Sequence, residues 1–349
     1  MERQSWLSQL LYTGAAVGGA ACAAVAARNL QRVLRARSRI KVLLAASAGT
    51  DARVVITGAT GGIGQELAEQ LLRNPSVHLL LGCRDHLKAQ RLFQSSERTK
   101  VHRLDLLDPD SVQAFADEAH LFLAGGESGL RMLVNNAGVM RPPVSQSKGD
   151  STWQTNFLGP FLLTELLARL RQKQQPSPVR VVHVSSRLEK RSQLDHHLLD
   201  AVTRGEVGEN PYADSKRGLM LWTSVRAQSL AFKGGLFCHA ASPGIVDSDL
   251  GRHVVPAWLW PFTKPLRSLV GWLQKRMLLM RSPAEGALAV VGGALTPQAT
   301  SCFGRYWDGE AQVEDLVIER MGNKQLALSL VKWATKATAL EQRADGYDR

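Results

Sequence analysis

The sequence predicts an α/β fold built on a single, doubly wound parallel sheet with helices on both faces. From Asp51 onward, short runs rich in β-branched and apolar residues alternate with longer segments of helical periodicity, as expected for parallel strands joined by crossover helices. Apolar residues make up 44% of the 349-residue chain and charged residues 21%, a composition that supports a large core. An uncharged stretch near the N-terminus predicts, in addition, a membrane-anchor helix ahead of this fold.

The individual elements follow from the position of each apolar run. Strands are predicted at Arg53–Thr57, His78–Cys83, Lys100–Leu104, Arg131–Val134, Val179–Val184 and Leu236–Ala241, and a last strand is expected at Gly304–Trp307. Helices are predicted at Gln65–Arg73, Pro109–Leu123, Thr152–Lys173 and Tyr212–Phe232. This order divides the chain into an N-terminal segment (1–41), one α/β domain (42–311) and a helical C-terminal extension (312–349).

The N-terminal segment is predicted to hold the protein on a membrane. Leu7–Ala27 is a run of 21 uncharged residues, and six basic residues with no acid follow between Arg28 and Lys41. By the positive-inside rule the α/β domain then faces the cytosol, and the endoplasmic reticulum is the favoured membrane. Two alternatives stay open: a mitochondrial presequence that is removed after import, and a helix that lies on the membrane surface.

The excess positive charge is confined to two stretches of the chain. The formal net charge is +12, and Arg28–Lys41 and Arg252–Arg281 each contribute six basic residues with no acid. The remainder is close to neutral, so nucleic acid is not expected as a partner, whereas basic residues beside apolar segments suit an anionic membrane surface. Four scattered cysteines and the adjacent pair His196 and His197 lack the spacing of metal ligands, so no metal site is predicted.

A glycine-rich turn links the first predicted strand to the first predicted helix of the domain. It reads Thr57-Gly58-Ala59-Thr60-Gly61-Gly62-Ile63-Gly64. Glycines let the backbone turn tightly and approach a pyrophosphate, and the helix N-terminus then offers free N–H groups and the positive end of its dipole. The turn therefore predicts a dinucleotide-binding site.

This turn and five further motifs resemble the short-chain dehydrogenase/reductase family, in the family's order, over roughly residues 51–310. The other motifs are Asn135-Asn136-Ala137-Gly138, Asn156 within a helix, Val184-Ser185-Ser186, Tyr212-Ala213-Asp214-Ser215-Lys216, and Pro243-Gly244-Ile245-Val246. The resemblance implies a Rossmann-like fold, a nicotinamide cofactor and a catalytic set made of Asn156, Ser186, Tyr212 and Lys216. The cofactor contacts it implies come from Thr57, Gly58, Gly62, Ile63, Gly64, Arg84, Asp105, Leu106, Asn136, Ala137, Gly138, Tyr212, Lys216, Pro243, Gly244, Val246 and Ser248.

The catalytic set makes chemical sense for reduction of a carbonyl, which needs a hydride on carbon and a proton on oxygen. Tyr212 and Lys216 lie four apart on a helix and so share a face, and a nearby ammonium is expected to lower the tyrosine pKa. By analogy with the family, Ser186 binds the substrate oxygen, Lys216 also binds the nicotinamide ribose, and Asn156 holds a helix irregularity with a water that relays protons.

Two features refine the resemblance. Ser186 and Tyr212 are 26 residues apart, and the insert around Asp195–Asp200 resembles the retinol-dehydrogenase-like members of the family. Departures are His183, where related sequences carry Asn, and Ser248, where they often carry Thr. Arg84 ends the second predicted strand, where a guanidinium suits the 2′-phosphate of NADP(H), so NADP(H) is favoured over NAD(H) despite the following Asp85.

The predicted function is NADP(H)-dependent interconversion of a lipophilic alcohol and its aldehyde or ketone, such as a retinoid, sterol, polyprenoid or fatty aldehyde. Residues 249–281, rich in Trp, Leu, Lys and Arg, are expected to form a lid that dips into the membrane; an ordinary apolar substrate lid or a homodimer contact is equally compatible. Gln312–Leu340 is expected to be helical, and either packing or a second membrane contact would explain its apolar stripe. The alternative function is a nucleotide-binding scaffold or partner-binding protein that retains the fold.

Overall fold

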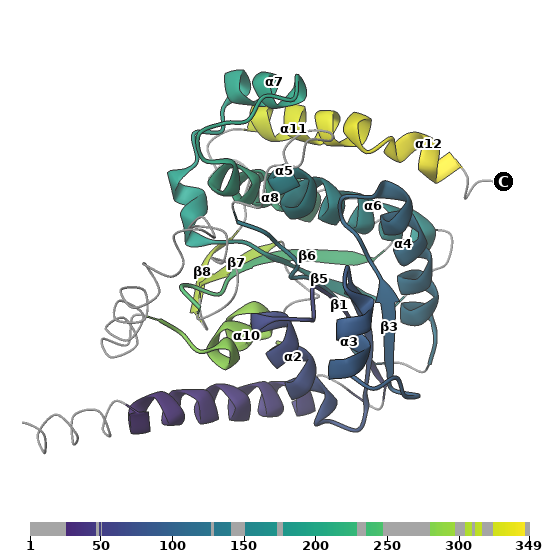
Figure 1. Ribbon diagram of the computed structural model, residues 1–349, viewed down its shortest axis with the longest axis vertical. Coiled ribbons are helices and arrows are strands. Elements are labelled where there is room, and N and C mark those ends of the chain that lie inside the picture. Colours follow the sequence, from purple (N-terminus) through teal and green to yellow (C-terminus); the bar gives the residue numbers. More distant parts are fainter. Residues whose placement is uncertain are drawn as a thin grey trace, which may run out of the picture.

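The computed structural model describes residues 26–46, 49, 51–126, 129–140, 151–172, 177–228, 235–246, 280–296, 304–308, 311–315 and 324–345. These residues form one α/β unit around a central sheet (Figure 1). The sheet has the strand order β3-β2-β1-β4-β5-β6-β7-β8. Its strands are β1 (Ala52–Thr57), β2 (Val77–Cys83), β3 (Thr99–Arg103), β4 (Arg131–Asn135), β5 (Val179–Val184), β6 (Leu236–Ser242), β7 (Arg305–Asp308) and β8 (Ala311–Asp315).

The first seven strands are parallel, as the sequence predicts, and the order is Rossmann-like. The prediction of a helix that begins at Gln312 is wrong at its start. β8 pairs antiparallel with β7 at the point where this helical extension was expected to begin. The edge of β7 offers unpaired backbone N–H and C=O groups, and the following segment turns back to satisfy them. Asp308 pairs with Ala311, so β7 and β8 form a short hairpin, which depends on β7 lying at this edge of the sheet and is not indicated by helical periodicity.

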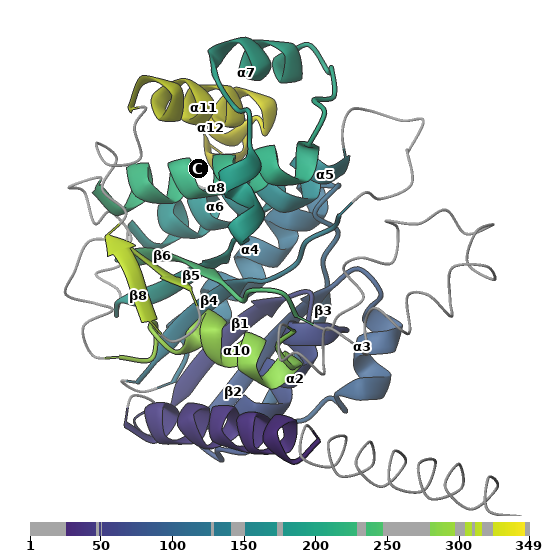
Figure 2. The same cartoon turned by 90° about the vertical axis from the view of Figure 1, so that its left-hand side faces the viewer.

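Helices cover both faces of the sheet (Figure 2). One face carries α2 (Gly62–Leu72) and α10 (Pro283–Val291), and the other carries α4 (Pro109–Ala124), α6 (Gly159–Gln172) and α8 (Pro211–Gln228). Alternate residues of β5 enter the two cores, Val181 on the α4/α6/α8 side and Val182 on the α2/α10 side. Strands that are buried on both faces are apolar throughout, which is why the sequence could predict them from continuous apolar runs.

A further layer lies outside α6 and α8. It consists of α7 (His196–Thr203), α11 (Lys324–Ala337) and α12 (Leu340–Asp345), seen together at the top of Figure 1. Leu326, Leu330 and Leu340 from the C-terminal helices are buried in the same core cluster as α6 and α8. The C-terminal extension therefore packs on the domain, which is one of the two roles expected for it.

Residues 26–46 form a helix that packs beneath α2 and α10 (Figure 2, purple). Ala36, Ile40 and Leu44 recur every four residues and are at most 3% exposed, so this stripe faces the domain core. Arg37 forms an ion pair with Glu66 (Nε–Oε1 2.9 Å), and Arg32 pairs with Glu285 (2.7 Å). The helix runs through residue 41 without a break, so the basic flank is in part a docking surface for the domain.

The predicted anchor cannot be traced in the structure. Residues 7–25 lie outside the described part of the chain, and only Ala26 and Ala27 of the predicted span belong to the helix described above. Among the described helices, none combines the length and apolar character needed to span a bilayer.

The predicted helix Thr152–Lys173 is interrupted. It consists of α5 (Ser151–Trp153), a π-helical turn η1 (Gln154–Leu158) and α6. Within it, the Gly159 N–H donates to the Gln154 carbonyl five residues before. Pro160 explains the change, because it has no N–H to donate to the Asn156 carbonyl four residues before and its ring crowds that carbonyl. The irregularity expected at Asn156 thus has a local cause in the sequence.

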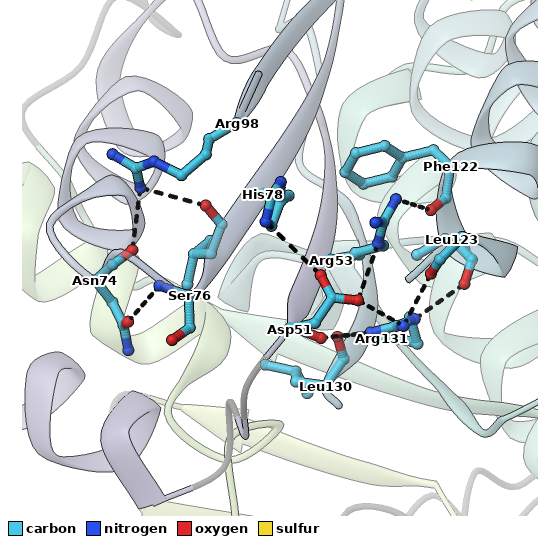
Figure 3. A network of polar contacts seen from close by, with 12 residues as sticks. Asp51, Arg53, Asn74, Ser76, His78, Arg98, Phe122, Leu123, Leu130 and Arg131 are labelled. Carbon is cyan, nitrogen blue, oxygen red and sulfur yellow. Dashed lines mark hydrogen bonds and ion pairs between the residues drawn. The ribbon is translucent and has the colours of Figure 1, made fainter. Parts of the chain in front are cut away.

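A buried polar network fastens α4 to the amino ends of the strands (Figure 3). The Arg131 guanidinium, 3% exposed, donates to the Asp51 carboxylate (3.0 Å) and to the carbonyls of Leu123 and Gly125 at the C-terminal end of α4. Arg53 donates to the same carboxylate (3.2 Å) and to the Phe122 carbonyl. Two cations at a helix C-terminus interact favourably with the helix dipole, and the one carboxylate offsets part of their charge. The network lies at the amino ends of the strands, whereas the candidate site lies at their carboxyl ends.

Candidate active site

The candidate site lies at the carboxyl ends of the strands, where the chain changes direction across the sheet. From β1 the chain proceeds to β2 and β3, and β4 then returns to pair with the other side of β1. The connections after β1 and β4 lead to helices on opposite faces of the sheet, and ligands of other doubly wound sheets bind at such a switch point.

The glycine turn and the Asn-Asn-Ala-Gly motif are joined by hydrogen bonds across this point. The Thr57 hydroxyl accepts the N–H groups of Asn136 and Ala137, both at 3.1 Å. The Asn136 side chain donates to the carbonyls of Thr57 (3.0 Å) and Gly58 (3.1 Å). Gly58 has φ of 71°, and a Cβ atom there would lie 2.8 Å from Ala137 Cα. The two motifs therefore hold one another in register.

The N-terminus of α2 is built to receive an anion. A Cβ on Gly64 would lie 2.4 Å from the Gly58 carbonyl oxygen, so only glycine lets the turn close on the helix. Within the described chain, no side chain caps this helix N-terminus and no acid occupies its first turn. Its backbone N–H groups and dipole are thus available to a phosphate. These residues fit the pyrophosphate of a dinucleotide.

The second strand ends beside this turn with Cys83, Arg84 and Asp85. Burial raises the pKa of the Cys83 thiol to about 11, which keeps the thiol protonated. Asp85 caps α3 (His86–Leu92), because its carboxylate accepts the Lys88 N–H (2.9 Å), whereas Arg84 is exposed. Asp105 follows β3 and accepts the Leu107 N–H (3.1 Å).

Leu106 lies where the first turn of α6 closely approaches the segment after β3. Leu106 is 5% exposed, and a Cβ on Gly159 would lie 2.8 Å from the Leu106 Cβ. The first turn of α6 can thus approach the segment after β3 only through a glycine.

Tyr212 and Lys216 occupy the first two turns of α8 and face the ends of β4 and β5. The Lys216 ammonium donates to the Val184 carbonyl at 2.7 Å and lies 5.9 Å from the centre of the Tyr212 ring. Ser186 caps the following 3-10 turn η2 (Arg187–Arg191), accepting the Leu188 N–H at 3.2 Å, and its hydroxyl is near enough to Tyr212 to affect the pKa of that phenol. The structure therefore brings these three side chains together.

Asn156 reaches the same place from the π-helical turn. Its amide oxygen accepts the Val139 N–H (2.8 Å), and its amide nitrogen donates to the Val139 carbonyl (2.9 Å) and the Ser215 hydroxyl (3.1 Å). A Cβ on Gly138 would lie 3.3 Å from the Asn156 amide oxygen and 3.5 Å from Lys216 Nζ. Gly138 thus leaves open the space that these two polar groups face.

Burial dominates the electrostatics of the site. It lowers the pKa of Lys216 to about 8, and it raises the pKa of Tyr212, an effect that the neighbouring Ser186 hydroxyl opposes. The expected lowering of the tyrosine pKa by Lys216 is therefore wrong for this arrangement, because the ammonium is directed at the Val184 carbonyl and the desolvated phenolate is costly. Burial also lowers the pKa of His183 to about 3, so this ring stays neutral while it accepts from the Asn135 amide (3.1 Å).

The Pro-Gly motif after β6 is braced by α10. Gly244 has φ of 76°, and the Arg281 guanidinium donates to the Pro243 carbonyl at 2.9 Å. A Cβ on Gly286 of α10 would lie 2.9 Å from Val246 and 3.0 Å from Ile63, so this glycine lets both predicted cofactor contacts pack against α10. Ser248 and residues 249–279 of the predicted lid lie outside the described residues.

Several residues that shape the site escaped the sequence analysis. Ser215 joins Asn156 to the Tyr212 carbonyl (2.9 Å), and the buried Asp214 carboxylate accepts from the Ser192 hydroxyl (2.8 Å) and the Gln193 N–H (3.0 Å). Asp214 thereby ties the predicted insert to α8, the helix that carries Tyr212 and Lys216. The helix α10 was also missed, although Ser282-Pro283-Ala284-Glu285 is a capping box with Pro at N1, a readable signal. His196 and His197 are exposed in the first turn of α7.

The chain belongs to the short-chain dehydrogenase family, whose model matches residues 52–257, and it is an oxidoreductase of that class. It is similar to retinol dehydrogenase 14 of Mus musculus, at 33% identity over 77% of this chain and 80% of that protein. Similarity to retinol dehydrogenase 12 of Homo sapiens is 32% over 80% of this chain and 87% of the relative. The NADPH-bound carbonyl reductase from chicken fatty liver shares the fold, with a TM-score of 0.52, 23% identity and coverage of 76% and 99%.

Proposed function

We propose that this chain is an NADP(H)-dependent oxidoreductase that interconverts a lipophilic alcohol and its aldehyde or ketone. Retinoids, sterols, polyprenoids and fatty aldehydes are the substrate classes considered. The observation that carries the proposal is the convergence of Ser186, Tyr212, Lys216 and Asn156 at the ends of β4 and β5, beside the glycine turn. The names of the retinol dehydrogenase relatives support a lipophilic substrate.

The four side chains divide the chemistry of reduction between them. A bound nicotinamide supplies the hydride. The Ser186 hydroxyl binds the carbonyl oxygen, and the Tyr212 hydroxyl donates the proton that this oxygen requires. Burial moves the Tyr212 pKa upward from an ordinary value that already lies well above 7, so the hydroxyl carries its proton at neutral pH and is a donor. Lys216, with a pKa of about 8, is mostly an ammonium at pH 7 and binds the ribose, and Asn156 holds the proton-relay water beside Lys216.

Arg84 supports the choice of NADP(H). It is exposed at the carboxyl end of β2, next to the helix N-terminus that fits the pyrophosphate. The neighbouring carboxylate of Asp85, which would favour the ribose hydroxyls of NAD, is engaged at the cap of α3. A guanidinium with no competing carboxylate in this position suits a 2′-phosphate.

Replacing Arg84 by alanine is expected to raise the Kd for NADPH by about tenfold, because a charge-assisted contact worth about 1.5 kcal/mol is lost. The Kd for NADH should stay within about twofold, since NADH has no 2′-phosphate. Fluorescence titration of both cofactors measures this. Arg91→Ala, which removes an exposed arginine from the end of α3, is the matched control. Equal weakening of NADPH and NADH binding would contradict the assignment of Arg84.

A membrane surface is the second partner proposed. The outward face of helix 26–46 carries three exposed aliphatic side chains, Leu30 (59%), Leu34 (54%) and Val42 (56%). No acid occurs in this helix, and four of its basic residues are exposed: Arg28, Arg35, Arg39 and Lys41. Aliphatic and basic side chains on one surface suit an anionic bilayer. Together with Leu7–Ala27, this face would hold the domain on the cytosolic side of a membrane, with the endoplasmic reticulum favoured.

The full chain is expected to co-sediment with vesicles that contain phosphatidylserine, and the triple variant Leu30→Gln, Leu34→Gln, Val42→Gln is expected to bind at least about threefold more weakly. The buried stripe of the helix is untouched, so folding should persist. A matched control changes the exposed Leu328 of α11 to Gln, on the far side of the sheet. If the triple variant bound as well as the parent, the outward face of this helix would not be a membrane contact.

The decisive test of the proposed function follows NADPH absorbance at pH 7, where Lys216 is mostly protonated, with a panel of lipophilic aldehydes and ketones. The full chain in mild detergent is expected to oxidise NADPH with at least one of them, and a water-soluble carbonyl of similar reactivity serves as the comparison. Binding of NADPH without turnover of any substrate would support the nucleotide-binding scaffold instead.

A further inference from the structure

The C-terminal helix α11 places an aromatic ring against the turn that carries Asn156. The Trp333 ring lies parallel to Phe157, with ring centres 6.0 Å apart and an angle of 8° between planes. It also meets Trp153 edge-on, at 5.6 Å and 88°. Trp153 and Phe157 are themselves edge-on at 5.6 Å, so the three rings form one cluster. This aromatic cluster joins the last helical layer to the catalytic layer.

Asn156 lies between the two residues that Trp333 contacts. Trp153 is the residue before the π-helical turn, and Phe157 lies within the turn, one position after Asn156. The turn lacks the regular hydrogen-bond ladder because Pro160 cannot donate to the Asn156 carbonyl. Its geometry therefore depends on side-chain packing more than that of a regular helix does. The Asn156 amide has to satisfy Val139 and Ser215 together, which tolerates little displacement.

We propose that Trp333 is a positioning residue for the active site, which holds the π-helical turn so that Asn156 keeps its contacts to Val139 and Ser215. This inference rests on the proposed function only for its effect on turnover. Within the part of the chain that the structure describes, the ring contacts of Trp333 are to Phe157 and Trp153, and Trp333 acts through these two residues. The C-terminal extension is thus a structural part of the catalytic site, although it follows the family core in sequence.

Docking of α11 and stacking of Trp333 are separable. Leu326, Ala327, Leu330 and Ala334 form a buried stripe on α11, and each is at most 2% exposed. Leu330 approaches α8 at Gly218, where a Cβ would lie 3.5 Å from the leucine side chain. Trp333 is only partly buried at the margin of this stripe. Truncating the indole should therefore leave the helix docked and release the π-helical turn alone.

The test compares Trp333→Ala, Trp333→Phe and Leu340→Ala in the full chain. Leu340 is a buried residue of α12 in the same core cluster, so its truncation loosens the C-terminal unit without removing a ring from the aromatic cluster. Hydrogen exchange of the Val139 N–H, which donates to Asn156, reports the turn directly. Steady-state kinetics at pH 7 gives kcat and KM. Thermal unfolding gives the Tm of each variant, so that the two alanine variants can be compared at equal loss of stability.

In Trp333→Ala, exchange at Val139 is expected to rise about tenfold and kcat to fall about tenfold, with KM and the Kd for NADPH within about twofold. Trp333→Phe keeps a ring on Phe157 and should restore at least half of kcat. Unchanged exchange at Val139 in Trp333→Ala, or an equal change in Leu340→Ala at matched stability, would overturn the proposal. If the parent turned over no carbonyl, the proposed function would fail, and the exchange measurement would still decide the role of Trp333.

Discussion

Replacing Tyr212 by phenylalanine is expected to lower kcat for carbonyl reduction by roughly 10²- to 10⁴-fold, the range attributed to a positioned general acid. The phenol is buried beside Ser186, and burial raises its pKa further above neutrality, so the proposed proton donor carries its proton at pH 7. Phenylalanine preserves the ring packing and removes only the hydroxyl. The measurement is NADPH oxidation at saturating aldehyde, together with the Kd for NADPH, which should change by less than about threefold.

Tyr306→Phe supplies the control for this experiment. Tyr306 is also buried, and burial raises the pKa of its hydroxyl to about 12, but it lies on β7 and not on α8 with Tyr212. Loss of this hydroxyl should leave kcat within about threefold of the parent. Comparable losses in the two variants would mean that a buried phenol supports the fold rather than the reaction. Full activity in Tyr212→Phe would exclude Tyr212 as the proton donor.

Asp51→Ala is expected to lower the free energy of unfolding by about 3–5 kcal/mol, the cost of leaving buried cations without their partner. The Asp51 side chain is 12% exposed and the Arg131 side chain 3%, so solvent cannot replace the lost carboxylate (Figure 3). Arg53 loses the same partner. Urea unfolding followed by circular dichroism measures the change. The Kd for NADPH should be preserved under native conditions, because the network lies at the edge of the sheet away from the glycine turn.

The matched control removes a carboxylate from an exposed pair. Arg204 and Glu206 are 59% and 58% exposed, and Glu206→Ala should change stability by no more than about 1 kcal/mol. A similarly small effect of Asp51→Ala would show that the carbonyls at the end of α4 satisfy both arginines without the carboxylate. Stability loss accompanied by weaker NADPH binding would show instead that the two edges of the sheet are coupled.

Local signals in the sequence were sufficient for the sheet and for the motifs at its carboxyl edge. Six strands and the last parallel one, β7, could be predicted because buried parallel strands are apolar on both faces. The glycine turn was legible because positive φ at Gly58 and the close approach at Gly64 admit no other residue. The roles of Asn156, Ser186, Tyr212 and Lys216 remain predictions, but the structure brings these residues together as the motifs predicted.

The sequence misjudged features that depend on partners far along the chain. The basic run after residue 28 predicted a membrane face, which stays a prediction, but the sequence did not reveal that two of its arginines bind the domain: Arg32 meets Glu285, 253 residues away, and Arg37 meets Glu66. The fourfold spacing of Tyr212 and Lys216 predicted a lowered tyrosine pKa, whereas burial and the Val184 carbonyl decide its direction. Neither carbonyl position nor desolvation can be read from spacing along a helix.

By itself, then, the sequence determined the parallel sheet, the dinucleotide turn, the order of the family's motifs and the break at Asn156, since Pro160 lies four residues after it. Only the tertiary structure decided that β8 turns back, that helix 26–46 docks by one face and exposes another, and that Trp333 packs on the turn of Asn156. The physical reason is the range of each effect. Backbone propensity, glycine conformation and proline exclusion act within a few residues, whereas burial, ion pairing and ring stacking require groups that only folding brings together.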